Sequence, residues 1–192
     1  MKLVITDRDG TINEDRDDYV KSVHEWAPIP GSLEALARLN QAGWQVVVAT
    51  NQSGLGRGLF DMGALNAMHA KMNRALALQG GRVEAIFFCP HAPEDECTCR
   101  KPAPGLFLEI ARRFDISLKG VPAVGNLPHD VLAAHAAGCE PHLLRTGKGA
   151  RLSAQQIEEL RQQVPGLTIH EDLSAFADYL LRREVEAQEA AA

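Results

Sequence analysis

The sequence has few cysteines, few aromatic residues, no excess of basic residues and no long apolar run. Four cysteines in 192 residues are too few for the disulfide scaffold of a small secreted domain. With 20 Lys and Arg against 25 Asp and Glu, no basic stretch is available to release the counterions of a nucleic acid. No window approaches the ~20 apolar residues of a membrane span, and the apolar start is too short for a signal peptide. We therefore expect a cytoplasmic protein without a nucleic-acid or membrane partner.

The composition, 45% hydrophobic and 23% charged, is that of a chain with one sizeable core. Short β-branched apolar runs alternate with segments of helical periodicity, which predicts βαβ units and an α/β fold. We expect a single domain over 1–192, with a Rossmann-like parallel sheet, helices on both faces and no large cap domain. The expected strands are 3–6, 44–49, 83–88, 122–124, 141–144 and 167–169. Two expected helices begin at the capping residues Ser32 and Asp61. Further helices are expected over 105–114, 130–137, 153–163 and 173–184. A charged, Ala-rich tail over 184–192 follows and either extends the last helix or frays.

Two carboxylates, Asp7 and Asp9, directly follow the first predicted strand. Open parallel sheets bind ligands beyond the carboxyl ends of their strands, so both side chains are expected at a site. A carboxylate bound to Mg²⁺ is ionised and can attack phosphorus, while a second one nearby can carry a proton. For this pair taken alone, a solvated turn after the strand is the alternative.

Polar residues follow three further strand ends or loops. Residues 50–54 offer a hydroxyl, amides and N–H groups that can hold a phosphate. Arg100 and Lys101 precede a proline before a predicted helix, and Asn126 and Asp130 follow the fourth predicted strand. Each segment alone also fits a purely structural role: a helix cap or turn, a surface pair of cations, or a helix N-terminus capped by Asp130.

Three thiolates and one imidazole lie close together in the sequence at Cys89, His91, Cys97 and Cys99. They form a complete tetrahedral set of Zn²⁺ ligands with no open position, which is typical of a structural site. The loop 89–104 has too few apolar residues to pack, so a metal crosslink gives it a reason to hold its shape. Unpaired surface cysteines with a chance histidine are the alternative.

In this order, the segments resemble the motifs of the haloacid dehalogenase superfamily of phosphohydrolases: Asp-x-Asp-x-Thr, a strand-end Thr, a Lys, and an acidic motif that begins Gly-Asp. Within it, Asp-Arg-Asp-Gly-Thr, Thr-Asn-Gln-Ser-Gly, Cys-Pro-His, Cys-x-Cys-Arg-Lys-Pro and Arg-Thr-Gly-Lys are similar to the D-glycero-D-manno-heptose-1,7-bisphosphate 7-phosphatases and their histidinol-phosphatase relatives. The resemblance covers most of the chain. It implies a Mg²⁺-dependent phosphatase that removes the C7 phosphate through an aspartyl-phosphate, on the route to lipopolysaccharide core sugars. A small-molecule sugar phosphate is then the expected partner, and we expect a monomer.

The resemblance also implies roles for single residues. Asp7 is the nucleophile and a Mg²⁺ ligand, and Asp9 is the general acid and base, with its backbone carbonyl on the metal. Thr50 and Lys101 bind the transferring phosphoryl group, and Arg100 recognises the distal part of the substrate. The residues expected to line the sugar are Asp15, Tyr19, Asn51, Gln52 and Ser53.

Asn126 departs from this pattern, because the family has a Mg²⁺-binding Asp at that position. An amide oxygen can still coordinate Mg²⁺, but the lost negative charge is expected to weaken binding. Asp130 remains and is expected to reach the metal directly or through water. Three functions therefore stay open: a heptose bisphosphate phosphatase, a histidinol phosphatase, and a catalytically impaired sugar-phosphate binder.

Overall fold

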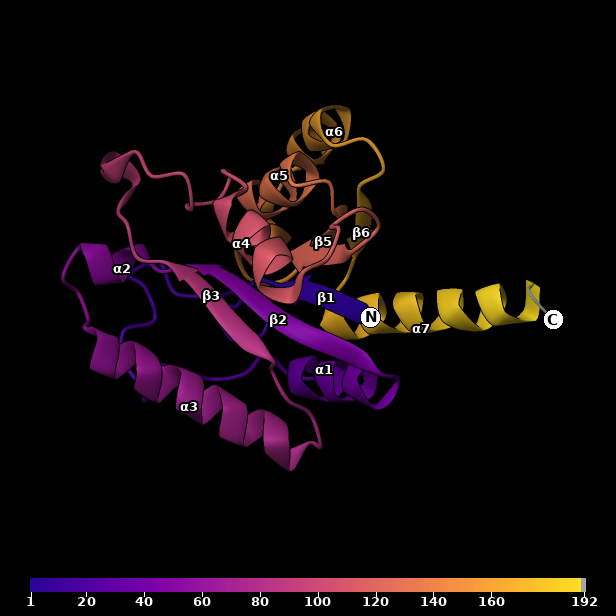
Figure 1. Ribbon diagram of the computed structural model, residues 1–192. Helices are drawn as coiled ribbons and strands as arrows, with labels where there is room; N and C mark the ends of the chain where they lie inside the picture. The colour runs from indigo at the N-terminus through magenta and orange to yellow at the C-terminus, as the bar shows by residue number, and fades with distance from the viewer. Residues whose placement is uncertain (191–192) are drawn as a thin grey trace.

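The computed structural model describes residues 1–190. Its centre is a six-stranded sheet in the order β3-β2-β1-β4-β5-β6, in which all neighbouring strands run parallel (Figure 1). The strands are β1 (Lys2–Thr6), β2 (Trp44–Asn51), β3 (Ala85–Cys89), β4 (Pro122–Gly125), β5 (Glu140–Leu144) and β6 (Thr168–His170). The strand order reverses between β1 and β4, and such a reversal leaves a crevice at the carboxyl ends of the two strands.

Helices cover both faces of this sheet. They are α1 (Ser32–Gln41), α2 (Ser53–Gly56), α3 (Met62–Leu78), α4 (Gly105–Phe114), α5 (Pro128–Ala136), α6 (Ala154–Gln163) and α7 (Leu173–Ala190), with 3₁₀ turns at Pro93–Asp95 and Gly147–Arg151. In Figure 1, α1 and α3 lie below the sheet and α4, α5 and α6 lie above it, while α7 packs against α1 and extends to the right. The expected α/β architecture is confirmed, and the strand connections within residues 1–190 contain no large cap domain. No helix in this part of the chain is long and apolar enough to cross a membrane.

Alternating side chains of the central strands bind the two helical layers. Val4 of β1 and Val46 and Val48 of β2 pack with α1, α3 and α7. Ile5 and Val47 point to the opposite face and pack with α4 and α5. Because both faces of the strands are covered, their sequences are almost continuously apolar, as the sequence analysis expected.

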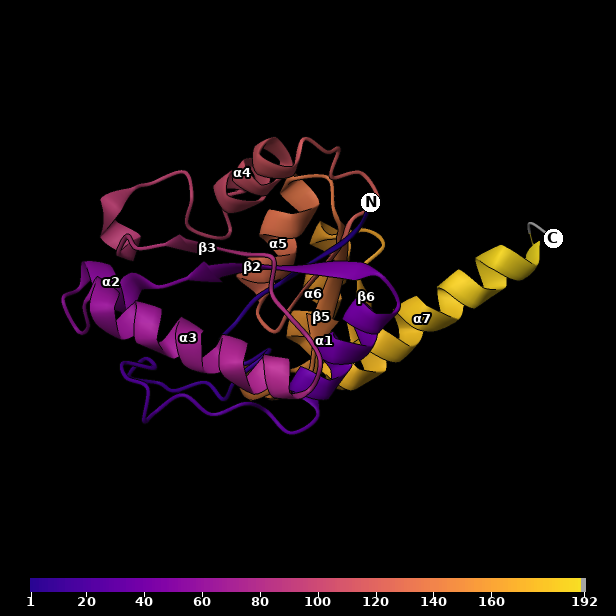
Figure 2. The same cartoon turned by 60° about the horizontal axis from the view of Figure 1, so that its bottom comes forward.

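Several boundaries differ from those expected. Strand pairing sets the end of β3 at Cys89 rather than Phe88, because Cys89 stands in register with Asn51 at the end of β2. The short helix α2 was not expected. The last helix α7 runs to Ala190 and extends beyond the sheet (Figure 2), so most of the tail continues this helix, and residues 191–192 lie outside the described chain.

The two expected helix caps behave differently. Asp61 caps α3, since its side chain accepts a hydrogen bond from the Ala64 N–H at 2.8 Å. Ser32 is not the cap of α1: Gly31 takes that position with a left-handed φ of 81°. The Ser32 hydroxyl instead donates to the Ile12 carbonyl at 2.6 Å. A tertiary hydrogen bond to the loop after β1 thus replaces the expected local one.

The long loop between β1 and α1 is anchored by its own apolar residues. Ile12, Val20 and Trp26 are buried in the core beneath α1 and α3. Lys71 of α3 donates to the backbone carbonyls of Val23 and Trp26 at 2.8 and 2.6 Å. The loop is therefore a packed part of the domain that can hold polar side chains in fixed places.

We predict that Trp26→Ala lowers the free energy of unfolding by about 3–5 kcal/mol, because it removes a fully buried aromatic side chain and leaves a cavity. Urea unfolding measures the change. The matched control is Leu78→Ala on the exposed end of α3, which is expected to change stability by less than about 0.5 kcal/mol. Equal effects of the two substitutions would show that Trp26 does not anchor the loop.

Candidate active site

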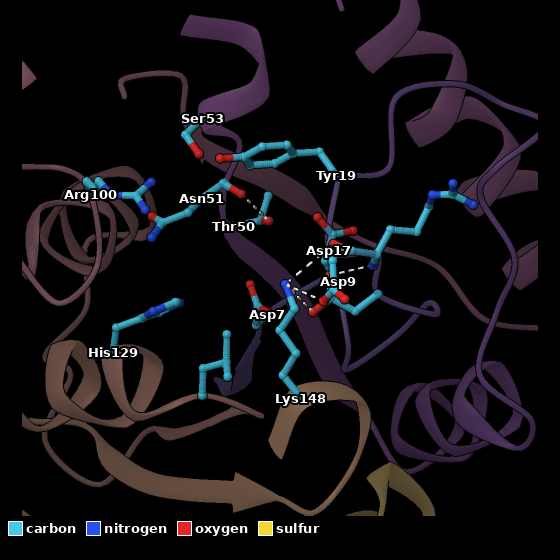
Figure 3. A pocket seen from close by; sticks show the side chains of 13 residues that line it. Asp7, Asp9, Asp17, Tyr19, Thr50, Asn51, Ser53, Arg100, His129 and Lys148 are labelled. Atoms are coloured by element: carbon cyan, nitrogen blue, oxygen red, sulfur yellow. Dashed lines mark hydrogen bonds and ion pairs between the residues drawn. The ribbon is translucent and has the colours of Figure 1, made fainter. Parts of the chain in front are cut away.

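A cavity of about 240 Å³ opens at the carboxyl ends of β1 and β2, beside the reversal of strand order (Figure 3). It brings together most of the residues expected at the site, from the loop after β1, the end of β2 and the loop before α4. The lining residues are Asp7, Asp9, Asp15, Arg16, Asp17, Tyr19, Thr50, Asn51, Ser53, Arg100, Leu127, His129 and Lys148. Four expected residues, Gln52, Lys101, Asn126 and Asp130, are buried around this cavity and do not line it.

Lys101 lies beneath Asp7, with its ammonium buried among acceptors. Its Nζ is 2.7 Å from Asp7 Oδ1 and 2.7 Å from Asp130 Oδ1, and it donates to the Ala49 carbonyl at 2.8 Å. Asn51 holds the Lys101 backbone on both sides: its Oδ1 accepts from the Lys101 N–H at 3.0 Å, and its Nδ2 donates to the Lys101 carbonyl at 3.1 Å. These contacts fix the cation under one oxygen of Asp7.

The buried charges shift one another's pKa values. Burial raises the pKa of Asp7 to about 6, and the nearby Asp130 carboxylate adds to the rise while Lys101 opposes it. Burial disfavours the charged form of Lys101, but Asp130 and Asp7 together outweigh it and raise the pKa of the ammonium. Burial likewise opposes ionisation of Asp130, yet Lys101 and His129 hold its pKa well below the usual range. Lys101 thus stays charged, while Asp7 lies where a further cation would favour its ionised form.

The pKa of Asp9 is shifted in the opposite direction. Burial opposes its ionisation, but the Arg8 guanidinium and hydrogen bonds from Arg8, Asn13 and Gln52 lower its pKa below the usual value. Gln52 donates through Nε2 to Asp9 Oδ2 at 3.0 Å and to the Thr50 hydroxyl at 2.9 Å. The Gln52 side chain is therefore occupied inside the protein, which explains why it does not line the cavity as expected.

Arg100 and Thr50 offer donors toward the cavity. The Arg100 Nη1 atom is buried and has no hydrogen-bond partner among the described residues. Buried donors are almost always paired, so this one indicates a place for an acceptor such as a phosphate oxygen. Thr50 is buried at the end of β2 and lines the same cavity as Asp7 (Figure 3).

Asn126 is fully buried and tied to two neighbouring loops. Its Nδ2 donates to the Thr146 carbonyl at 3.2 Å, while its Oδ1 receives a longer bond of 3.5 Å from the Thr11 hydroxyl. The loop after β1 passes so close that a Cβ at Gly10 would lie 2.2 Å from Nδ2. The amide thus keeps its nitrogen against a carbonyl, and its oxygen is the less firmly bound atom.

Asp130 supports the site from below. Its Oδ2 accepts from the N–H groups of Asn126 and Leu127 at 3.1 and 3.0 Å, and its Oδ1 faces Lys101. Both oxygens are therefore engaged, and Gly125 leaves no space for a Cβ, which would lie 2.4 Å from that of Asp130. The start of α5 turns the carboxylate toward Lys101, and the contact of Asp130 with a metal, directly or through water, stays a prediction.

Oxygen donors near the cavity fit Mg²⁺. Asp7 contributes a carboxylate, Asp9 a backbone carbonyl, and Asn126 an amide oxygen, all of which are the hard ligands that this ion takes. The carboxylates of Asp7 and Asp130 share one buried ammonium, and burial together with the Asp130 charge raises the pKa of Asp7. A divalent cation beside Asp7 would oppose this rise.

A cluster of sulfur and nitrogen ligands forms a second candidate metal centre. The ligand atoms of Cys89, His91, Cys97 and Cys99 all lie within 4.8 Å of one another. Cys89 ends β3, and the Arg100 N–H donates to the Cys97 sulfur at 3.3 Å, as backbone groups do around metal-bound thiolates. The four residues expected to bind zinc are thus brought together in a set compatible with it.

Some cavity residues were not found from the sequence. Lys148 lies 3.4 Å from Asp15 and 3.9 Å from Asp17 through its ammonium, and His129 contacts Asp130 at 3.3 Å. Lys148 belongs to the segment 145–148, which was part of the resemblance but had no chemical role attached. His129 carried no signal, since only the start of α5 brings it to the cavity.

Comparisons with known proteins agree with this geometry. A family model described as Polynucleotide kinase 3 phosphatase matches residues 2–122, and one described as HAD-hydrolase-like matches residues 98–174. The D-glycero-beta-D-manno-heptose-1,7-bisphosphate 7-phosphatase of Bordetella bronchiseptica is 56% identical, over 95% of this chain and 99% of that protein. The protein of that name from Pseudomonas aeruginosa is 49% identical, over 94% of this chain and 98% of its own.

A solved structure extends the agreement to three dimensions. The crystal structure of D,D-heptose 1,7-bisphosphate phosphatase from B. bronchiseptica, complexed with magnesium and phosphate, matches with a TM-score of 0.90. The match has 56% identity and covers 95% of this chain and 99% of that one. Identity at this level over nearly the whole of both proteins places the chain in the haloacid dehalogenase superfamily of phosphatases, as a member of the D-glycero-beta-D-manno-heptose-1,7-bisphosphate 7-phosphatase family.

Proposed function

We propose that this phosphatase removes the C7 phosphate of D-glycero-D-manno-heptose 1,7-bisphosphate, the substrate in the names of its relatives. The observation that carries the proposal is the buried Asp7–Lys101 pair, of which Asp7 lines the same cavity as Arg100 and Lys148. A substrate with two phosphates fits a cavity with a nucleophile at one place and further cations elsewhere. Arg100, with its unpaired buried donor, is the proposed contact for the phosphate that is kept.

The residues support a reaction in two displacements. The free oxygen of Asp7 attacks phosphorus, the bond from phosphorus to the C7 oxygen breaks, and protonated Asp9 gives that oxygen its proton. Asp9 then takes a proton from a water, whose oxygen attacks the phosphorus of the aspartyl-phosphate and releases inorganic phosphate and the Asp7 carboxylate. Lys101 and the Thr50 hydroxyl stabilise the negative charge on the phosphoryl oxygens in both steps.

Magnesium is the proposed cofactor, and Asp7, the Asp9 carbonyl and Asn126 are the proposed ligands. Bound there, Mg²⁺ would neutralise phosphoryl oxygens and keep Asp7 ionised. Asp130 is proposed to reach the ion directly or through water, and it also holds the Lys101 ammonium in place. The chain's own groups thus supply the nucleophile, the proton carrier and two hydrogen-bond donors to the phosphoryl oxygens.

We predict that Asp7→Asn reduces phosphate release from the heptose bisphosphate to below about one thousandth, because an amide cannot attack phosphorus. The circular dichroism spectrum is expected to stay native, since the amide can still accept from Lys101. The native chain is also assayed with histidinol phosphate, and it should release phosphate faster from the heptose bisphosphate. Turnover by Asp7→Asn would contradict the covalent mechanism, and a preference for histidinol phosphate would contradict the proposed substrate.

We predict that Asn126→Asp tightens Mg²⁺ binding about tenfold, because affinity rises with the charge of the ligands. The maximal rate of the native chain should persist at high Mg²⁺. Calorimetric titration with Mg²⁺ in the presence of phosphate measures the affinity directly, and phosphate release gives the metal requirement. An unchanged Mg²⁺ affinity would show that Asn126 is not a ligand. A native chain without turnover at any Mg²⁺ concentration, activated by the substitution, would establish the impaired homologue.

We propose that Cys89, His91, Cys97 and Cys99 hold one structural Zn²⁺. The closed set of four ligands leaves no position for a reacting group, so the ion would fix the loop that carries Arg100 and Lys101.

Elemental analysis of protein purified without added metal should then give one zinc per chain, and Cys97→Ser should release it. Chelation should make the loop 90–104 more sensitive to protease, because the crosslink is lost. Cys139→Ser, at a buried cysteine outside the cluster, is the control and should keep its zinc. Absence of zinc, or a loop whose cleavage does not change on chelation, would contradict the structural site.

We also propose that the chain acts as one domain and as a monomer in the cytoplasm, as the sequence analysis expected. The continuous sheet supports the first point.

Asp15, Tyr19, Asn51 and Ser53 are the proposed contacts for the sugar, because they line the cavity.

A further inference from the structure

Arg8 is a second buried cation beside the site, and it does not line the cavity. Its side chain has no exposed surface, although it lies between the two catalytic carboxylates in the sequence. Removing a guanidinium from water is costly unless its charge and its N–H groups are matched. The groups that match it therefore indicate what the side chain does.

Arg8 holds both oxygens of the Asp9 carboxylate. Nε donates to Oδ1 at 2.9 Å and Nη2 donates to Oδ2 at 3.0 Å, which is a two-point contact between two planar groups. Nη2 also donates to the Gln52 side-chain oxygen at 3.1 Å. Nη1 lies 3.0 Å from Nε2 of His69 on α3, and because arginine has no acceptor, this histidine nitrogen must be the unprotonated one.

Two further side chains donate hydrogen bonds to the Asp9 carboxylate. Asn13 Nδ2 donates to Oδ1 at 2.9 Å, and Gln52 Nε2 donates to Oδ2 at 3.0 Å, so each oxygen receives two hydrogen bonds from within the protein. The backbone is held as well, because the N–H groups of Thr11, Ile12 and Asn13 converge on the Arg8 carbonyl at 2.8 to 3.2 Å. Asp9 nevertheless lines the cavity, and 23% of its side chain is exposed.

We propose that Arg8 is a positioning residue, held by His69 and Gln52, that fixes the plane of the Asp9 carboxylate so that its exposed part faces the reacting group in both displacements. Proton transfer needs donor and acceptor within hydrogen-bond reach and aligned, and a carboxylate free to turn about its side-chain bonds loses that alignment. The inference rests on the proposed acid–base role of Asp9. Lysine cannot replace this function, since a single ammonium fixes a distance but not a plane.

The first test is Arg8→Lys, with heptose bisphosphate and Mg²⁺. We expect kcat to fall at least about tenfold and KM to change by less than about threefold, because Arg8 does not line the substrate cavity. In an Asp9→Asn background, Arg8→Lys should lower kcat no further, since the group that it positions is already gone. An unchanged kcat, or losses that multiply in the double variant, would overturn the proposal.

His69 gives a test that does not depend on replacing a buried charge. His69→Leu removes the acceptor for Nη1 and should lower kcat about threefold or more, whereas His69→Gln offers an amide oxygen and should restore most of it. Ser32→Ala, which removes a buried hydrogen bond at the far end of the same loop, is the control for lost stability. If His69→Leu lowers the melting temperature as Ser32→Ala does and leaves kcat unchanged, the cluster is structural only.

Asp9→Asn on its own separates the positioning role of Arg8 from the acid–base role of Asp9. If Asp9→Asn alone leaves kcat unchanged, the acid–base role of Asp9 is wrong and the positioning role is wrong with it. If Asp9→Asn lowers kcat about a hundredfold or more while Arg8→Lys does not lower it, only the positioning role is wrong.

Discussion

The buried ammonium of Lys101 is the interaction on which the carboxyl edge of the sheet depends. It joins the end of β1 through Asp7, the end of β2 through the Ala49 carbonyl, and the start of α5 through Asp130. Burying an ion costs on the order of several kcal/mol unless its partners are well placed, so these three chain segments have to meet at one point. The reversal of strand order makes this possible, because it brings β1, β2 and β4 side by side with their carboxyl ends together.

Two buried cations divide the charge of the site between two carboxylates. Lys101 is shared between Asp7 and Asp130, so it leaves Asp7 with a pKa raised to about 6 by burial. Arg8 is paired with Asp9 alone and lowers the pKa of that carboxyl despite burial. Two similar carboxyl groups, two residues apart, therefore have different charge environments.

The strand pattern and the main site residues could be predicted because their signals are local. Buried strands are apolar runs, and residues that follow them lie at one edge of a parallel sheet, which gave Asp7, Asp9 and Thr50 their place. Other features depend on tertiary contacts that no local pattern encodes. Gln52 lies within the expected segment but turns inward to Asp9 and Thr50, and Ser32 bonds to a distant loop instead of capping its helix. The buried partnership of Arg8 with His69 joins residues far apart in the sequence and was missed for the same reason.

The position of Cys89 also bears on the length of the edge strand β3. β3 is an edge strand whose sequence, Ala-Ile-Phe-Phe-Cys, is apolar and aromatic, and such an edge is a template for pairing with another chain. Cys89 is its last residue, and the chain then leaves the sheet to bring His91 toward the same cluster. The ligand cluster therefore limits the length of the exposed edge. The opposite edge, β6, is limited more simply, because it has only three residues.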